Sequence, residues 1–121
     1  MIAKDRLSQE FLEGIRQIGP LLSILGFSSY SFYEKGPAYY IKYKKTTTES
    51  IVEFLFGPSD WDIEIIIFTS KGKFAFKDLL QIPAIAEWVN RNRYKQDNGR
   101  SIKKELLWAI ELLKASLPVI E

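Results

Sequence analysis

The stretch IVEFLFGPSDWDIEIIIF, residues 51–68, alternates apolar and other side chains on both sides of a central GPSD. Successive side chains of a strand point to opposite faces, so this alternation predicts two strands that each bury one face. Residues 57–60 are of the types that favour turns. A short connection joins neighbouring antiparallel strands, and the stretch therefore predicts a β-hairpin.

The same alternation continues on both sides of the hairpin. Residues 28–34 and 38–45 precede it with strand-like patterns, and residues 73–77 follow it after the tight turn SKGK. Short connections throughout predict an antiparallel meander of four or five strands. One face of this sheet is expected to be apolar and to need a cover. Its members are Tyr39, Ile41, Tyr43, Val52, Phe54, Phe56, Ile63, Ile65, Ile67, Phe74 and Phe76.

The first 25 residues predict a helix, because apolar side chains recur every three or four positions. The resulting stripe consists of Leu7, Phe11, Ile15, Ile18, Leu22 and Leu25. Pro20 lacks an amide hydrogen, so we expect a kink there, or a break at which Pro20 opens a second short helix. Gly26 is expected to end the helix, with Phe27 folding back onto its last turn.

Two further helices are predicted towards the C-terminus. Asp78 can cap a short turn, and Pro83 suits the first position of a helix over residues 83–94. Ser101 can cap a last helix, which Pro118 is expected to end. The buried stripe of this last helix is predicted to consist of Ile102, Leu106, Ala109, Ile110, Leu113 and Leu117.

These elements together predict one α+β domain over residues 1–121. Its antiparallel meander sheet, of four or five strands, carries one N-terminal and two C-terminal helices packed on one face. Trp88 and Trp108 fall inside the predicted helices. Each is expected to pack in the core or at its rim rather than to serve as a ligand platform.

The composition excludes several kinds of function. The 121 residues include no cysteine and no histidine, which removes disulfides, thiolate nucleophiles and the usual general base near neutral pH. A formal net charge of +2 does not require nucleic acid or an anionic membrane as partner. The N-terminus MIAKDRLSQEF carries charges where a signal peptide is apolar, and no apolar run is long enough to span a membrane. A soluble cytoplasmic protein is the resulting expectation.

The acidic side chains of residues 49–64 are the first candidate site. This stretch holds five acids and no base. One interpretation is a solvated sheet face, on which lysines of the outer strands flank carboxylates that lie side by side on the two central strands. The other is a surface that binds a basic protein partner through charge and an aromatic anchor. The residues of this protein-binding surface would be Glu49, Glu53, Asp60, Trp61, Asp62 and Glu64.

Paired carboxylates could also serve acid–base catalysis or hold a divalent cation. No phosphate-binding loop, nucleophile elbow or metal signature accompanies them in the sequence. We therefore expect a non-enzymatic protein with no catalytic residue, no metal ligand and no cofactor.

The basic stretch of residues 91–104 is the second candidate site, with six bases and one acid. With Tyr94 among them, these bases could bind the phosphates of a nucleic acid. The simpler interpretation is that cations near the end of a helix are favoured by its dipole. A third is contact with the acidic stretch of a second copy, which would give a homodimer. The nucleic-acid-binding residues would be Arg91, Arg93, Lys95, Arg100, Lys103 and Lys104.

The order of the elements carries a family resemblance, together with the segment FLEGIRQIGPLLSILGFSSYSF at residues 11–32. A leading helix ends in Leu25, Gly26 and Phe27, and a strand meander and C-terminal helices follow. In this order the chain resembles small bacterial immunity proteins of polymorphic toxin systems and related families of unknown function. The resemblance covers the whole chain as architecture. Its only motif is the Leu-Gly-Phe turn, so no functional residue is carried over.

The resemblance implies a non-enzymatic protein that neutralises a cognate toxin by tight binding. The leading expectation is therefore a protein-binding module of the immunity type, with a toxin as partner. The alternative is a nucleic-acid-associated or regulatory binding protein that uses residues 91–104, and an enzyme comes third.

Overall fold

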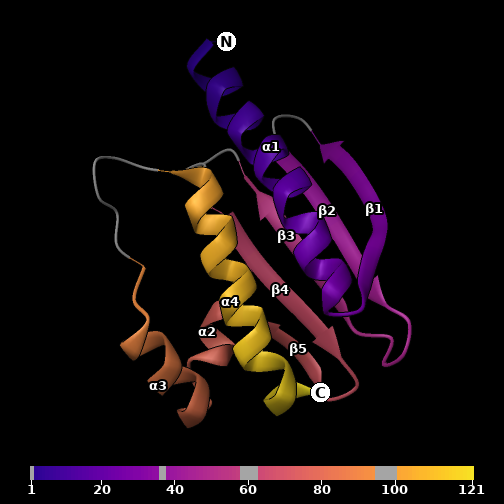
Figure 1. Cartoon of the computed structure of the whole chain (residues 1–121), viewed down its shortest axis with the longest axis vertical. Helices are drawn as coiled ribbons and strands as arrows, with labels where there is room; N and C mark the ends of the chain where they lie inside the picture. Colours follow the sequence, from indigo (N-terminus) through magenta and orange to yellow (C-terminus); the bar gives the residue numbers. More distant parts are fainter. Residues whose placement is uncertain (1, 36–37, 58–62, 95–100) are drawn as a thin grey trace.

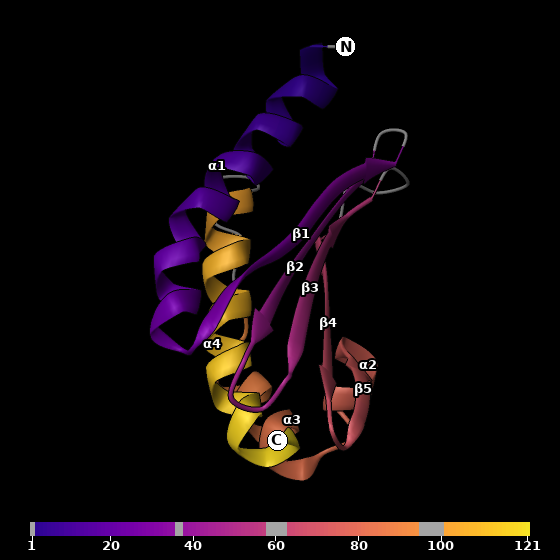
Figure 2. The ribbon, with the colours of Figure 1, turned by 90° about the vertical axis from the view of Figure 1, so that its right-hand side faces the viewer.

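The computed structural model describes residues 2–35, 38–57, 63–94 and 101–121 (Figure 1). Its helices are α1 (Ile2–Ile24), α2 (Phe76–Leu79), α3 (Pro83–Arg91) and α4 (Ile102–Ile120). Its strands are β1 (Phe27–Lys35), β2 (Ala38–Lys45), β3 (Ile51–Phe56), β4 (Ile63–Thr69) and β5 (Gly72–Ala75). The long helices α1 and α4 lie on one side of the sheet, so a helical layer covers a sheet layer (Figure 2).

The strands form one sheet in the order β1-β2-β3-β4-β5, and each neighbouring pair is antiparallel. Consecutive strands lie side by side because their connections are too short to cross over the sheet. The predicted α+β class and antiparallel meander are confirmed. Within the described residues the sheet has five strands.

The inner face of the sheet, which α1 and α4 cover, is the predicted apolar face. Its central row places Ile41, Phe54 and Ile65 side by side on β2, β3 and β4. Phe54 has no exposed surface, and the other two are buried as well. Burial of a side chain of this size stabilises the fold by about 1.5–3 kcal/mol. The prediction is confirmed from Tyr39 through Phe74, since all of these residues are buried or pack against the core.

Phe76 departs from the predicted inner face. β5 ends at Ala75, and Phe76 begins α2 with 39% of its surface exposed. The Asp78 carboxylate accepts a hydrogen bond of 2.8 Å from the Ala75 N–H and so holds the start of α2. The prediction of a strand through Lys77 is therefore wrong. The strand ends two residues earlier, at Ala75, because this cap starts a helix at Phe76.

The outer face of the sheet, opposite the helices, has a different register from the one expected. Glu53 lies between Lys42 and Ile66, and Glu64 lies opposite Leu55. The lysine beside Glu53 is confirmed, with 3.7 Å between Lys42 Nζ and Glu53 Oε2. The expected pairing of carboxylates on the two central strands is wrong for Glu53 and Glu64, because each faces an apolar residue on the neighbouring strand.

Helix α1 continues through Gly19 and Pro20 as one element, so the predicted break is wrong. Pro20 removes one helical hydrogen bond, at a cost of about 3 kcal/mol. Ile18 and Leu22 lie on either side of it and have no exposed surface. Their burial, at about 1.5–3 kcal/mol each, offsets that cost and keeps the apolar stripe on one helix.

Gly26 ends α1 as predicted. Its φ is +94°, and its N–H donates a 2.9 Å hydrogen bond to the Ser23 carbonyl. A residue with a side chain is strained in this left-handed region. We expect Gly26→Ala to lower the free energy of unfolding by about 1–2 kcal/mol. Gly26→Asn should cost less, since asparagine tolerates this conformation. Urea denaturation of the two variants measures the difference, and equal losses would contradict it.

The C-terminal helices follow the prediction in part. Ser101 caps α4 by accepting a hydrogen bond from the Lys104 N–H, and every residue of the predicted α4 stripe is buried. α4 continues past Pro118 to Ile120, whose burial against the core holds the last turn. α3 ends at Arg91 rather than at residue 94. It packs against α4 beyond the edge of the sheet instead of on its face, so that part of the predicted arrangement is wrong (Figure 1).

No helix in the described residues combines the length and apolar character needed to cross a membrane. The longest, α1, carries charged side chains such as Arg6, Glu10 and Glu13.

Candidate functional site

A groove of about 830 Å³ lies between β4 and α4. The first half of β4 forms one wall, and the α4 residues Glu105, Trp108, Ala109 and Leu112 form the other. The junction of β5 and α2 closes one end, and Tyr94 lies at its border. The volume falls within the range of about 300–1,000 Å³ that is typical of ligand sites. We refer to this feature as the β4 groove.

The β4 groove exists because β5 is shorter than β4. Cα partners of β4 on β5 run only from Ile66, opposite Ala75, to Thr69, opposite Gly72. Within the described residues, β5 offers no Cα partner to residues 63–65. From Phe76 the chain continues into α2, which contacts β4, and the groove lies between the start of β4 and α4.

Aromatic side chains pack around Trp108 on the α4 wall. The Trp108 ring lies 6.1 Å from that of Phe76, 5.8 Å from that of Trp88 and 6.5 Å from that of Tyr94, between ring centroids. The Trp108 indole N–H also donates a hydrogen bond to the Asn92 carbonyl. The contacts with Phe76 and Tyr94 are edge-to-face, an arrangement that orients rings in addition to burying them. Trp88 and Trp108 pack against the core, as predicted, and Trp108 also lines the groove.

Three charged side chains line the β4 groove. Glu64 and Lys77 are exposed, and Glu105 is half-buried. The lining therefore combines aromatic and aliphatic surface with two carboxylates and one ammonium group. Among the residues that the structure describes, no three acidic side chains converge closely enough to hold a metal ion.

The predicted acidic site is spread out along β3. Glu49 lies on the β2–β3 connection, with Oε1 3.9 Å from Lys44 Nζ. Glu53 lies in the middle of the outer face and is 8% exposed. Glu64 lies near the opposite end of β3 and is the one described member that lines the β4 groove. Asp60, Trp61 and Asp62 lie outside the described residues.

The predicted nucleic-acid site is partly neutralised by acids. Arg91 Nε lies 3.7 Å from the Glu87 carboxylate, and Lys103 Nζ lies 3.6 Å from the Glu13 carboxylate. Arg93 donates a 3.2 Å hydrogen bond to the Asn90 side chain. Lys104 is exposed, and Lys95 and Arg100 lie outside the described residues. Of the four described bases of this site, Arg91 and Lys103 thus have an acidic partner.

The sequence patterns do not indicate that several of these residues line a groove. Phe76 was assigned to the covered face of the sheet, and Lys77 to its strand. The signal that could have placed them is Asp78, since an acid at the third position of a helix commonly holds its start. No local pattern indicates that Glu105 and Tyr94 lie beside β4. Glu105 comes there with α4, and Tyr94 through its contact with Trp108 on that helix.

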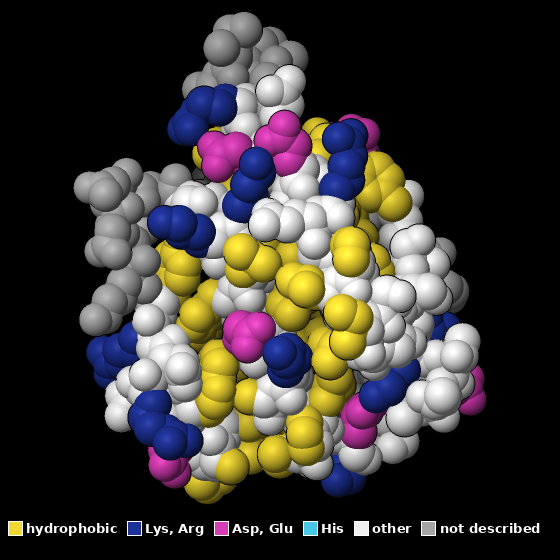
Figure 3. Space-filling view, viewed as in Figure 1, with side chains coloured by type: hydrophobic (Ala, Val, Ile, Leu, Met, Phe, Trp, Pro, Cys, Tyr) yellow, Lys and Arg dark blue, Asp and Glu magenta, His cyan; other side chains and the backbone are white. Residues whose placement is uncertain are grey.

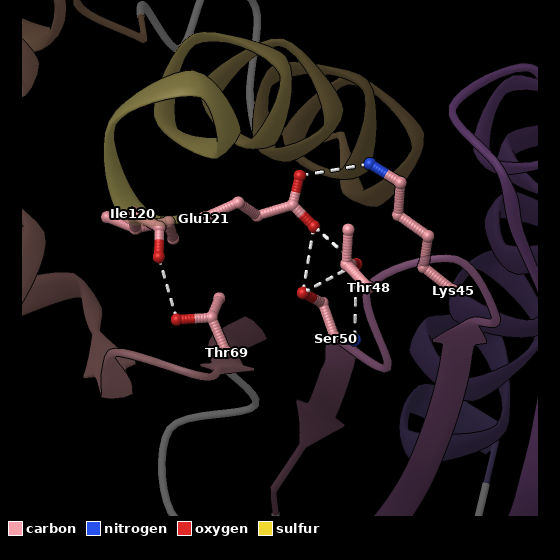
Figure 4. Close-up of polar contacts among 6 residues, drawn as sticks. All are labelled: Lys45, Thr48, Ser50, Thr69, Ile120 and Glu121. Atoms are coloured by element: carbon pink, nitrogen blue, oxygen red, sulfur yellow. Dashed lines mark hydrogen bonds and ion pairs between the residues drawn. The ribbon is translucent and has the colours of Figure 1, made fainter.

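Away from the β4 groove, a cluster of polar side chains joins the C-terminal end of α4 to the sheet (Figure 4). One Glu121 carboxylate oxygen accepts hydrogen bonds from Thr48 Oγ1 at 2.7 Å and Ser50 Oγ at 2.8 Å, and the other accepts one from Lys45 Nζ at 2.9 Å. Thr69 Oγ1 donates a 2.7 Å bond to the Ile120 carbonyl. We call these residues the α4 clasp. Its polar groups bind one another, so its role is to hold α4 on the sheet.

The titration of Glu121 reflects these contacts. Burial acts to raise the pKa of its carboxyl, but hydrogen bonds from Thr48, Lys45 and Ser50, together with the charge of Lys45, outweigh burial. The pKa of Glu121 is therefore below its ordinary value. A depressed pKa means that folding stabilises the charged form.

Large exposed hydrophobic side chains elsewhere are dispersed. Ile24 lies at the end of α1, Val119 at the end of α4, and Phe32 and Tyr33 on the edge strand β1. Figure 3 shows hydrophobic side chains along the helical layer, interrupted by charged ones. The β4 groove differs from these surfaces because it is concave.

Scans against models of protein families, against curated proteins and against solved structures each find no match for this chain. No activity is therefore carried over from a relative, and function has to be inferred from the residues of the molecule itself.

Proposed function

We propose that this protein is a non-enzymatic protein-binding module that holds part of its partner in the β4 groove. The observation that carries this proposal is the β4 groove itself, a hollow of about 830 Å³ whose lining includes the aromatic side chains of Phe76, Tyr94 and Trp108. Aromatic side chains that become buried in a contact commonly dominate its binding energy.

The charges of the β4 groove favour a protein partner over a nucleic acid. The exposed Glu64 carboxylate would repel phosphate groups, and Lys77 is the one basic residue in the described groove lining. The pairing of Arg91 with Glu87 and of Lys103 with Glu13 likewise gives no support to nucleic-acid binding.

The family resemblance supports a more specific proposal about the partner. Under it the partner is a cognate bacterial toxin, which the module neutralises by occupying its surface. Absence of histidine and cysteine from the sequence agrees with a function that needs binding and no chemistry. A cytoplasmic site of action is part of this form of the proposal.

The test is affinity capture from cells of the native host, followed by titration of the captured protein. Phe76 and Leu80 make a matched pair, since they are 39% and 37% exposed and only Phe76 lines the β4 groove. Phe76→Ala is expected to weaken binding of the partner by about tenfold or more, because an anchor leaves the groove. Leu80→Ala is expected to leave it unchanged.

Nuclease treatment and thermal unfolding are the controls. The partner should survive nuclease, and both variants should unfold near the temperature of the parent, since both side chains are exposed. Equal binding by the two alanine variants would overturn the proposal, as would recovery that depends on nucleic acid.

A further inference from the structure

We propose that a hollow between α1 and β1 is a second binding site, which accepts the phosphate group of a small organic molecule. One wall of the hollow is the face of α1 that carries Arg16, Gly19 and Ser23, and the other is the start of β1 with Ser28 and Ser29. We refer to it as the α1 hollow. It shares no described lining residue with the β4 groove, so it is separate from the site of the proposed function.

The hydroxyl of Tyr43 is the observation that points to a ligand. Tyr43 lies on the inner face of β2, is 5% exposed and lines the α1 hollow. Its ring packs edge-to-face on that of Phe54 in the core, and its hydroxyl has no hydrogen-bond partner within the described residues. Among these residues, Ser8 alone has an unpartnered side-chain oxygen that is fully enclosed, so the Tyr43 hydroxyl reaches solvent, and the α1 hollow is where it does so.

A polar group that is buried without a partner costs stability, and a ligand in the α1 hollow would supply the missing partner. Burial raises the pKa of Tyr43 above its ordinary value. The hydroxyl therefore keeps its proton near neutral pH and can act as a hydrogen-bond donor to an acceptor in the hollow.

The charge of the α1 hollow favours an anion. Arg16 is exposed and makes no ion pair within the described residues, and none of the described lining residues is acidic. Ser23, Ser28 and Ser29 bring further hydroxyl groups, and Ser29 lies beside Tyr43 as its cross-strand partner. One guanidinium and several hydroxyl donors match the three terminal oxygens of a phosphate group better than the two oxygens of a carboxylate.

Gly19 leaves room for the ligand. A Cβ at this position would meet no other part of the chain within 4 Å. Gly14 on the same helix differs, because a Cβ there would lie 2.5 Å from a side-chain carbon of Leu106. Packing thus explains Gly14 but not Gly19, although glycine in the middle of a helix is less favourable than alanine. The missing side chain keeps this wall of the α1 hollow open.

The size of the α1 hollow fits a small molecule. Its volume of about 450 Å³ lies within the range of about 300–1,000 Å³ that is typical of ligand sites. Ile15 and Phe27 add apolar surface for the organic part of the ligand. A nucleic acid would need a series of cations for its successive phosphates, whereas Arg16 is the one base in the described lining.

The experiment is titration of the ¹⁵N-labelled full chain with phenyl phosphate at constant ionic strength, followed by NMR. We expect saturable shifts of the Gly19 and Ser29 amide signals, with a Kd of about 1 mM or below. Benzoate, which carries a carboxylate on the same ring, should bind more weakly.

Three variants test the residues of the α1 hollow. Arg16→Gln should weaken binding of phenyl phosphate about tenfold, because a charge-assisted hydrogen bond is lost. Arg6→Gln, on an exposed part of the same helix, is the matched control and should leave binding unchanged. Tyr43→Phe should weaken binding about fivefold and unfold near the temperature of the parent, since only an unpartnered hydroxyl is removed. Gly19→Leu should fill the hollow and abolish binding in a folded chain.

Several results would overturn the inference. They are the absence of saturable shifts at Gly19 and Ser29, equal binding of benzoate, and an unchanged Kd for Tyr43→Phe or Gly19→Leu. Equal losses for Arg16→Gln and Arg6→Gln would also overturn it, because they would show a general attraction of anions to α1. None of these results bears on capture of a partner through the β4 groove, which the Phe76→Ala and Leu80→Ala pair tests separately.

Discussion

Replacement of Phe11 by alanine is expected to lower the free energy of unfolding by about 3–5 kcal/mol. Phe11 lies on α1 and has no exposed surface. Its ring stacks on that of Phe56 at 4.8 Å and lies 6.0 Å from that of Tyr39, between ring centroids. The truncation removes these ring contacts between α1 and strands β2 and β3. Because the site is fully enclosed, it leaves a cavity that neighbours fill only in part.

The matched control for this variant is Phe32→Ala. Phe32 lies on the edge strand β1 and is 52% exposed. The same truncation there should cost less than about 1 kcal/mol, because solvent already contacts the ring. Chemical denaturation followed by tryptophan fluorescence measures both losses. Similar losses for the two variants would show that α1 does not pack on the sheet as described.

Removal of the Glu121 carboxylate is the second change that we expect to lower the free energy of unfolding strongly. Glu121→Ala deletes the acceptor of the α4 clasp and leaves Lys45 and Ser50 without it; Ser50 is 1% exposed. Hydrogen bonds to a charged group contribute about 1.5–3 kcal/mol. We expect a loss of about 2–3 kcal/mol near neutral pH. Glu111→Ala should cost less than about 0.5 kcal/mol, since its ion pair with Lys114 is exposed.

The effect of Glu121 should depend on pH in a defined direction. Its folded-state pKa is lowered from an ordinary value of 4.5. The stability that it contributes is therefore fully present above 4.5 and is lost as the pH falls through the lower folded-state value. Urea denaturation at a series of pH values should show the parent and Glu121→Ala converging as the medium becomes acidic. A gap that widens with acidification would contradict the clasp.

Much of the fold was readable from local patterns. The alternation of Val52, Phe54 and Phe56 against Glu53, and of Ile63, Ile65 and Ile67 against Glu64, correctly assigned the two faces of the sheet. A strand repeats every two residues and a helix about every 3.6, so burial on one face leaves a signature in the chain itself. Capping by Ser101 and the helix stop at Gly26 are equally local, since each depends on one residue and its near neighbours.

The errors arose where distant contacts overrule local preference. Pro20 and Pro118 were expected to interrupt helices, but burial of the apolar residues around them keeps both helices continuous. The pairing of Glu53 and Glu64 was misjudged for a related reason. Which residues face each other across two strands depends on register, and the composition of a single strand does not contain it.

In the candidate site, too, some features follow from the local sequence and others from tertiary packing alone. The sequence alone predicts Glu64 as a binding residue from its acidic surroundings, and the structure places it in the lining of the β4 groove; its role in binding stays a prediction. The β4 groove itself depends on β5 ending at Ala75, on α2 turning the chain away, and on α4 bringing Trp108 back to β4. Its residues come from segments far apart in the chain, between 63 and 112. Periodicity reports which side of an element is buried, whereas a cavity arises from the relative lengths and placement of several elements, and only their packing decides those.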